Sequence, residues 1–356
     1  MIRILFKVVV LLFIVAVIGG LGVSTFWQRL HAPFKGYTDE EQFVDVPSGA
    51  STRDIGRRLV EARVVEDETL FRAAAWWSGR GRSLKAGEYR FDRPMTPIEV
   101  LDKIARGDAY ARRITFPEGL TIAEMAKIYE SRGLGPAASF IQAAGDVTLI
   151  ADLDPAARDL EGYLFPETYA LPRGTPVGRL IAMMVGRFKA SYTEELRGRA
   201  AAEGLTTRQV VTLASLVEKE TGQAGERSTV SAVYRNRLKI RMALQADPTV
   251  VYALQRAGRY DGNIRRDDLA FDSPYNTYKY PGLPPGPIAA PGKASLEAAL
   301  APAPVGYLYF VSRNDGSHVF ATTLAEHNRN VQKFQVEFFR QQRQGEGGRG
   351  RGRRAG

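Results

Sequence analysis

The sequence contains no cysteine and only three histidines among its 356 residues. The absence of cysteine excludes disulfide bonds and thiolate metal sites, and it suits an oxidising compartment. The histidines (His31, His318 and His327) are scattered without the spacing of metal ligands, so the sequence favours no metal site. We therefore expect no cofactor, and both His318 and His327 are interpreted as structural residues near a strand, Tyr307–Val311, that is followed by a helix.

Positive charge is plentiful but unevenly distributed. The formal net charge is +10, and residues 340–356 carry six arginines and one glutamate, which is half of that excess. This tail is rich in glycine and has no apolar side chains to bury, so we expect it to be disordered. The remaining excess is ordinary for a solvated surface, and no nucleic-acid partner is predicted.

The N-terminus carries one long apolar segment. Val8 to Trp27 contains Ser24 and Thr25 as its only hydroxyl residues, and as a helix it would span about 30 Å, the thickness of a bilayer core. Arg3 and Lys7 precede it, which places residues 1–7 in the cytoplasm by the positive-inside tendency. A cleaved signal peptide is the alternative, but no Ala-x-Ala site follows. We expect a transmembrane helix over residues 8–28 with the rest of the chain exported.

A strand–turn–helix pattern occurs twice, seventy residues apart. Pro47, Gly49 and Ser51 of the first copy match Pro117, Gly119 and Thr121 of the second, and Asp54 matches Glu124. The pattern predicts a short strand, a Pro-x-Gly turn and a helix whose N-cap is Ser51 or Thr121. The acidic residue stands at the capping-box position. The pattern over residues 40–135 resembles LysM-type modules, which bind chitin-like and peptidoglycan glycans; a recurring strand–helix unit that only positions a catalytic domain explains it equally well.

An aromatic segment, Leu160–Tyr169, combines three aromatic and two acidic side chains. Aromatic faces beside hydrogen-bonding groups suit sugar rings, so Glu161 and Tyr163 are candidate substrate-binding residues. A loop held in a core by Phe165 and Tyr169 is the alternative. An amphipathic helix is expected to follow over residues 175–196.

The most informative segment is the helix that opens at Thr207. It is apolar nearly all round and ends in Glu218-Lys-Glu220-Thr221, so it should be buried. Residues two apart on a helix point in different directions, so one of Glu218 and Glu220 can face inward. An apolar environment raises the pKa of a carboxyl toward the range that suits a proton donor. The alternative is a solvated, charged helix end.

Several downstream motifs accompany this acid. They are Ser231–Leu238, Met242–Tyr252, Ser273–Tyr278 and the proline-rich Gly282–Gly292. Together with Glu220-Thr221 they resemble the endolytic murein transglycosylases, the MltG or YceG-like family, from the membrane anchor to about residue 335. The resemblance implies a single-pass protein of the bacterial inner membrane, with a LysM-like subdomain and a catalytic domain (residues 136–336) in the periplasm. The implied fold is α+β, and the implied partners are peptidoglycan glycan strands and peptidoglycan synthases.

The resemblance also selects among the carboxylates. Lytic transglycosylases carry their catalytic acid in a Glu-Ser or Glu-Thr pair at a helix end, which corresponds to Glu220-Thr221. Its action on nascent strands would leave 1,6-anhydro-N-acetylmuramic ends and terminate elongation. Further candidate substrate-binding residues are Thr221, Asn236, Gln245, Asp247, Thr249, Asn276, Thr277 and Tyr278.

Other interpretations remain open at this stage. Asp247 followed by Pro248 is also typical of a helix N-cap and first helical residue. Arg235 and Arg237 could contact peptide-stem carboxylates or simply be surface charges. A hydrolase (muramidase) would need a second carboxylate, which Asp247 or Glu161 could supply, and a glycan-binding scaffold would need no acid at all. The proline-rich segment is expected to form a rigid cleft wall.

Overall fold

The computed structural model describes residues 2–338 and 340 and contains two compact units. The first unit comprises Met1–Arg113 and Ala170–Thr175, and the second comprises Ile114–Tyr169 and Pro176–Gly356. Strands β3 (Arg112–Thr115) and β4 (Thr168–Leu171) pair in a two-stranded sheet. Apart from Arg340, the tail predicted to be disordered lies outside the described residues. The mixture of helices and short sheets is the predicted α+β class.

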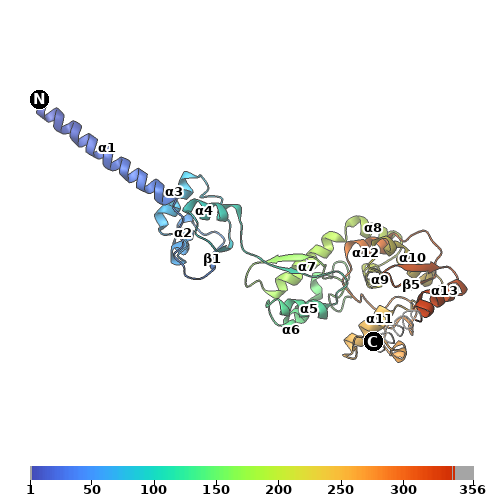
Figure 1. The fold of residues 1–356 in the computed structure, drawn as a ribbon. Coiled ribbons are helices and arrows are strands. Elements are labelled where there is room, and N and C mark those ends of the chain that lie inside the picture. Colours follow the sequence, from blue (N-terminus) through green and yellow to red (C-terminus); the bar gives the residue numbers. More distant parts are fainter. Residues whose placement is uncertain (1, 339, 341–356) are drawn as a thin grey trace, which may run out of the picture. The chain divides into compact units, whose positions relative to one another are not determined.

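The N-terminal helix α1 (Ile2–Leu30) contains the predicted apolar segment (Figure 1). Its part from Leu12 to Leu30 is long and apolar enough to cross a membrane. Residues 12–29 are all exposed, so their apolar side chains have no protein core to cover them, and Leu30 at the end of the helix is buried. The helix is thus compatible with a single-pass anchor.

The first unit continues as a strand, two helices and a strand. These are β1 (Gln42–Val46), α2 (Thr52–Glu61), α3 (Glu68–Trp77) and β2 (Gly87–Phe91), followed by α4 (Pro97–Arg106). Strand β1 pairs antiparallel with β2, with Val44 opposite Tyr89. Alternate residues of both strands, such as Val46 and Phe91, are buried, as the two-residue repeat of a strand requires. Ile55 and Leu59, one turn apart on α2, cover this sheet within the same core.

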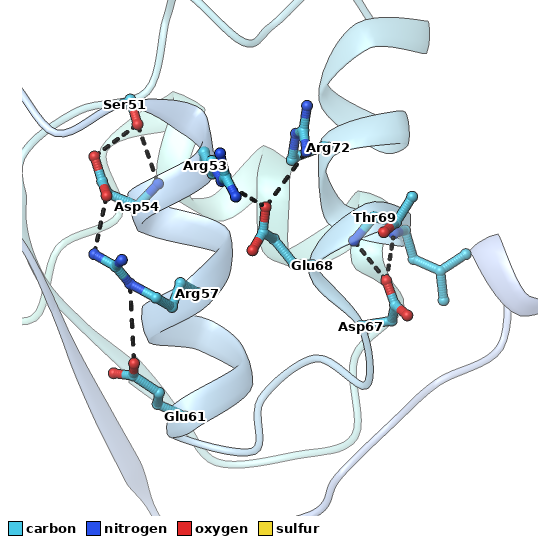
Figure 2. A network of polar contacts seen from close by, with 10 residues as sticks. Ser51, Arg53, Asp54, Arg57, Glu61, Asp67, Glu68, Thr69 and Arg72 are labelled. Atoms are coloured by element: carbon cyan, nitrogen blue, oxygen red, sulfur yellow. Dashed lines mark hydrogen bonds and ion pairs between the residues drawn. The ribbon is translucent and has the colours of Figure 1, made fainter.

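Figure 2 shows how α2 and α3 are held together at their polar surface. Glu68, the first residue of α3, lies 3.5 Å from Arg53 on α2 and 3.4 Å from Arg72 one turn further along α3. Asp67 caps α3 by accepting the backbone N–H groups of Thr69 and Leu70. Exposed ion pairs of this kind contribute only about 0–1 kcal/mol each, so the apolar core carries the stability of this unit.

Both copies of the sequence repeat form the predicted capped helices. Gly49 and Gly119 have φ values of +79° and +77°, which explains why each turn uses glycine. Ser51 accepts the N–H of Asp54 at the start of α2. Thr121 caps α5 (Ile122–Ser131), where the longer side chain of Glu124 also reaches the N–H of Thr121 and completes the capping box. The two predicted N-caps are confirmed.

The second unit is mainly helical. After α5 it contains α6 (Ala137–Ala143), α7 (Val177–Ser191), α8 (Glu194–Ala202), α9 (Thr207–Glu220), α10 (Arg227–Lys239), α11 (Asp247–Arg256), α12 (Lys293–Leu300), the hairpin β5 (Tyr309–Ser312) and β6 (His318–Ala321), and α13 (Leu324–Val331). Short 3-10 turns cover Val147–Leu149, Ala224–Glu226 and Arg266–Ala270, and a π-helical segment covers Gln332–Glu337.

Helix α9 forms the centre of this unit and packs against α8, α10, α11 and α12 (Figure 1). Its residues from Val210 to Val217 are all buried, as predicted from its apolar sequence. The helix begins at Thr207 as predicted, and Thr206 is its N-cap, with a complete capping box to Gln209. The burial of α9 on all sides fixes its two ends, and each end carries polar residues.

Two local predictions are wrong. The helix expected over residues 175–196 ends at Ser191, and α8 begins after it because the Thr193 side chain caps a new helix by accepting the N–H of Leu196. The strand near Tyr307–Val311 is followed by a second strand, β6, before any helix. His318 lies at the start of this additional strand.

Candidate active site

Glu220 is the last residue of α9. Its Oε2 atom is shielded from solvent and accepts no hydrogen bond from any described residue. Burial, which penalises the charged form, raises the pKa of Glu220 to about 7. The carbonyl groups at a helix C-terminus also disfavour a negative charge. The pKa therefore lies close to neutral pH, where both the protonated and the ionised form are populated.

Two side chains of α10 face this carboxyl. The Tyr234 hydroxyl is buried and has no well-aligned hydrogen-bond partner among the described residues. Its interaction with the Glu220 carboxylate lowers the pKa of Glu220 and so opposes the effect of burial. Arg237, one turn further on, also lowers that pKa through its charge. Arg237 itself is buried and donates to the carbonyls of Leu308 and Leu244, each at 2.6 Å, so it is not a surface charge.

Tyr234 was not predicted to belong to the site, and Arg237 was considered only as a contact for peptide-stem carboxylates or as a surface charge. Positions 234 and 237 are three residues apart, so they share one helix face. A tyrosine and an arginine on one face of a buried helix were the signal available in Ser231–Leu238. What the sequence does not reveal is that this face of α10 meets the C-terminal end of α9.

The start of α11 brings a second carboxylate toward Glu220. The interpretation of Asp247 as an N-cap is wrong, because Ala246 is the N-cap and no side chain caps this helix. Asp247 instead accepts a hydrogen bond of 2.5 Å from the Tyr278 hydroxyl, and its negative charge raises the pKa of Glu220 further. Gln245, just before it, is exposed and has a φ of +48°, a strained conformation that often marks functional loops.

The threonines and the asparagine of the neighbouring motif lie beneath this loop. Thr249 and Thr277 are buried and share a hydrogen bond of 2.9 Å between their hydroxyls. Thr277 also accepts the N–H of Ala246. The Asn276 amide donates to the carbonyls of Leu269 and Phe271 at 3.0 and 2.8 Å. In this conformation all three residues hold the loop that carries Asp247 and Tyr278, and their predicted substrate contacts stay predictions.

Asn276→Ala is expected to destabilise the protein by about 2 kcal/mol, because two carbonyls lose their donors and a buried side chain is removed. Urea unfolding followed by circular dichroism measures this loss. Asn263→Ala, at an exposed position, is the matched control and should change stability little. Equal stability of the two variants would show that Asn276 does not hold the loop.

Thr221 ties the end of α9 to the hairpin. Its hydroxyl lies 3.3 Å from Glu226 Oε2, and the same oxygen lies 2.7 Å from His318 Nδ1. Glu226 Oε1 accepts the backbone N–H of His318. Burial raises the pKa of Glu226, but the hydrogen bonds from His318 outweigh burial and leave it lowered. His318 thus acts as a structural partner of a carboxylate that positions the residue after Glu220.

Glu218 has a different environment from Glu220. Its Oε2 atom accepts the N–H of Gly292 at 2.9 Å, and its other oxygen lies 3.6 Å from Arg227. The proline-rich segment that it contacts is largely buried, since Ile288 also donates its N–H to Ser215 inside α9. This segment crosses the core of the unit, and Glu218 helps to fix it there.

The remaining candidates form hydrogen bonds or line a cavity without contacting Glu220. Glu161 and Tyr163 line a cavity of about 180 Å³ together with Arg208 near the start of α9. Arg208 and Glu220 are twelve residues apart on this helix, which corresponds to about 18 Å. Asn236 donates its amide to the carbonyls of Val305 and Tyr307, so it joins α10 to the segment before β5.

Glu161 is a second buried acid. Burial raises its pKa to about 8. Its oxygens accept hydrogen bonds from the N–H of Ile122 at 3.0 Å and from the hydroxyl of Tyr252 at 3.2 Å. Both oxygens of Glu161 therefore accept hydrogen bonds, one from the first residue of α5 and one from a tyrosine of α11, so Glu161 links these two helices. Glu220, in contrast, has one oxygen without a hydrogen bond.

Fold and site together define a mixed α+β protein with an apolar N-terminal helix and a glutamate, Glu220, whose Oε2 atom is shielded from solvent and whose pKa is raised. The chain belongs to the YceG-like family, whose model matches residues 44–333. The resemblance inferred from the sequence motifs is therefore confirmed.

Three known proteins illustrate this relationship. A Bacillus subtilis protein named endolytic murein transglycosylase is 34% identical over 307 residues, which cover 82% of this chain and 84% of that protein. A Streptococcus pneumoniae protein of the same name is 29% identical over 318 residues; the match covers 81% of this chain but only 57% of that longer protein. The crystal structure of a YceG-like protein from Listeria monocytogenes is 31% identical, with a TM-score of 0.56, and covers 82% of this chain and 99% of that one.

Proposed function

We propose that this chain is an endolytic lytic transglycosylase that cuts nascent peptidoglycan strands between N-acetylmuramic acid and N-acetylglucosamine and so terminates their elongation. The observation that carries the proposal is Glu220, a buried carboxyl with one unbonded oxygen and a pKa near 7. Such a group can give a proton and later take one at neutral pH. The relatives named endolytic murein transglycosylases support the same activity.

The proposed reaction needs this single acid. Glu220 protonates the glycosidic oxygen, the bond from that oxygen to the anomeric carbon breaks, and the strand with the free hydroxyl leaves. The resulting carboxylate then takes the proton of the muramyl C6 hydroxyl, whose oxygen closes onto the anomeric carbon of the same sugar. Because the nucleophile belongs to the substrate, its effective molarity is high and no second carboxylate is required. The acid ends in its starting form, and no water is consumed.

The neighbouring side chains have complementary roles in this proposal. Tyr234 and Arg237 stabilise the carboxylate formed after the first step, since both lower the pKa of Glu220. Asp247 keeps the acid protonated before that step and stabilises the positive charge that develops on the sugar. Tyr278, which donates to Asp247, and the exposed Gln245 are proposed to contact the substrate.

The rest of the chain suits a site at the cell envelope. Helix α1 would anchor the protein in the inner membrane with both units in the periplasm, near peptidoglycan synthases. The β1-α2-α3-β2 order of the first unit supports a LysM-like part that binds glycan. Neither the orientation nor glycan binding is required for the chemistry at Glu220.

The products of purified glycan strands test the activity directly. Mass spectrometry should find muropeptides with anhydro ends, each lighter by one water than a hydrolysis product. Cuts inside the strands should shorten the whole length distribution rather than release single disaccharides from an end. Strands that stay intact would instead favour a glycan-binding scaffold without catalysis.

A muramidase is the second candidate, and Asp247 is the observation that favours it. Its charge acts on Glu220, so a pair of carboxylates is present that could activate water. Reducing ends that take up oxygen from isotopically labelled water would establish this hydrolase. Anhydro ends without labelled oxygen would exclude it.

The pH dependence of cleavage should follow Glu220. The reaction starts from the protonated acid, so the rate should fall as the pH rises through about 7. Asp247→Asn removes a charge that raises this pKa, so its alkaline limb should move to lower pH. Tyr234→Phe removes a group that lowers the pKa, so its limb should move to higher pH. Each movement should reach up to about one unit.

The position of the limb is the readout, because both variants also change the maximal rate. Tyr280→Phe, at an exposed position, is the control and should leave the limb in place. If the alkaline limbs of Asp247→Asn and Tyr234→Phe shifted in the same direction, the assignment of Glu220 as the titrating acid would be contradicted.

A further inference from the structure

All three tryptophans of the chain lie at one place in the first unit. Trp27 is in the last turn of α1, and Trp76 and Trp77 end α3. The ring centroids of Trp27 and Trp77 are 5.5 Å apart in an edge-to-face contact. Trp76 and Trp77 are nevertheless 82% and 65% exposed. Large aromatic side chains left uncovered together mark an interaction surface.

The end of α1 is fixed to this unit. Leu30 is 1% exposed and belongs to its hydrophobic core, and Arg29 lies 3.0 Å from Glu66, just before α3. The C-terminal end of α3 therefore lies beside Trp27. The acidic start of α3 lies near Arg29, which is closer than Trp27 to the C-terminal end of α1.

We propose that the tryptophan end of α3 inserts into the interfacial layer of the bilayer that holds α1, so that the first unit rests on the membrane surface. The headgroup layer of each leaflet is about 5–8 Å thick. Trp27 stands near the end of the Leu12–Leu30 span, where that helix would leave the hydrocarbon core. The 5.5 Å contact then places Trp77 in the same layer, in which tryptophan is enriched.

The charges around these rings fit phospholipid headgroups. The loop Ser78-Gly-Arg-Gly-Arg82 follows Trp77 and contains no acid. Arg80 pairs with Asp102, whereas Arg82 has no ion pair among the described residues. With Arg72 and Trp76, Arg82 lines a shallow hollow. The acids Glu66, Asp67 and Glu68 lie at the other end of α3, which is ten residues long, or about 15 Å away.

The proposed membrane contact of Trp76 and Trp77 depends on the proposed membrane anchor α1. The three tryptophans allow the contact and the anchor to be tested separately. The full chain is reconstituted into vesicles of phosphatidylethanolamine and phosphatidylglycerol, with brominated lipids as fluorescence quenchers. W76F/W77F leaves Trp27 alone and reports the anchor, whereas W27F/W77F leaves Trp76 alone and reports the surface. Phenylalanine keeps an aromatic ring at each position, and Trp76 is too exposed for its replacement to disturb folding.

We expect bromines near the headgroups to quench Trp76 at least about twofold more than bromines deep in the chains, and aqueous acrylamide to quench it weakly. If Trp27 is quenched by lipid while Trp76 responds only to acrylamide, the surface proposal fails and the anchor stands. If neither responds to bromine, both fail. Protection of Trp76 by added glycan strands but not by lipid would assign the surface to sugar binding and also overturn the proposal.

Discussion

Glu220→Gln is expected to lower the rate of strand cleavage by a factor of about 10²–10⁴, the usual contribution of a general acid–base group. Glutamine has nearly the same shape as the protonated acid but can neither give nor take the proton. The affinity for glycan strands should change little, since no charge is lost from the form that binds. Anhydro muropeptides counted by mass spectrometry measure the rate, and strand pull-down measures the affinity.

Glu218→Gln is the matched control two residues away. Its oxygen can still accept the N–H of Gly292, so the proline-rich segment should stay in place and activity should remain within about tenfold of the parent chain. Loss of activity in Glu218→Gln together with an active Glu220→Gln would overturn the assignment.

Stability gives an independent check that Glu220 is buried. Its pKa in the folded protein is about 7, above the ordinary 4.5. Its protonation therefore stabilises the fold fully below pH 4.5, and this contribution is lost as the pH rises through about 7. A difference of this size corresponds to about 3 kcal/mol. Glu220→Gln keeps a neutral side chain, so it should unfold at higher temperature than the parent chain in alkaline buffer and similarly in acid.

Helices and caps could be predicted because their causes are local. The apolar sequence of α9 requires burial on all sides, and the Thr121 cap needs only a hydroxyl followed by a glutamate three residues later. The choice of Glu220 over Glu218 came from the family resemblance. In the structure Glu218 accepts the N–H of Gly292 and lies near Arg227, and the catalytic role of Glu220 stays a prediction.

The composition of the site was harder to predict because it depends on contacts between distant segments. Asp247 followed by proline has the sequence of an N-cap, but the hydroxyl of Tyr278, thirty-one residues away, holds its carboxylate. Arg237 has the sequence of a surface residue, yet it is buried against two carbonyls. Polar groups acquire such partners only when helices pack, and no periodicity in one segment reveals them.

The aromatic segment Leu160–Tyr169 makes a second strong prediction, because its glycine has no space for a side chain. Gly162 has a φ of +81°, and a Cβ atom there would lie 2.4 Å from Pro287 Cβ and 3.0 Å from Val211 Cγ1. The left-handed conformation costs a non-glycine residue about 1–2 kcal/mol, and overpacking adds about 1–3 kcal/mol. Gly162→Ala is therefore expected to destabilise the protein by about 3 kcal/mol in urea unfolding.

Gly204→Ala separates the two causes, since Gly204 has a φ of +67° but no atom within 4 Å of the position that a Cβ would take. It should cost only the conformational part, about 1–2 kcal/mol. Equal losses in the two variants would show that the proline-rich segment yields to the new methyl group. The folded fraction of Gly162→Ala should keep nearly normal activity per molecule, because the clash lies against Pro287 and Val211 and not at Glu220. A specific loss of activity without loss of stability would instead restore the interpretation of this segment as part of the sugar-binding site.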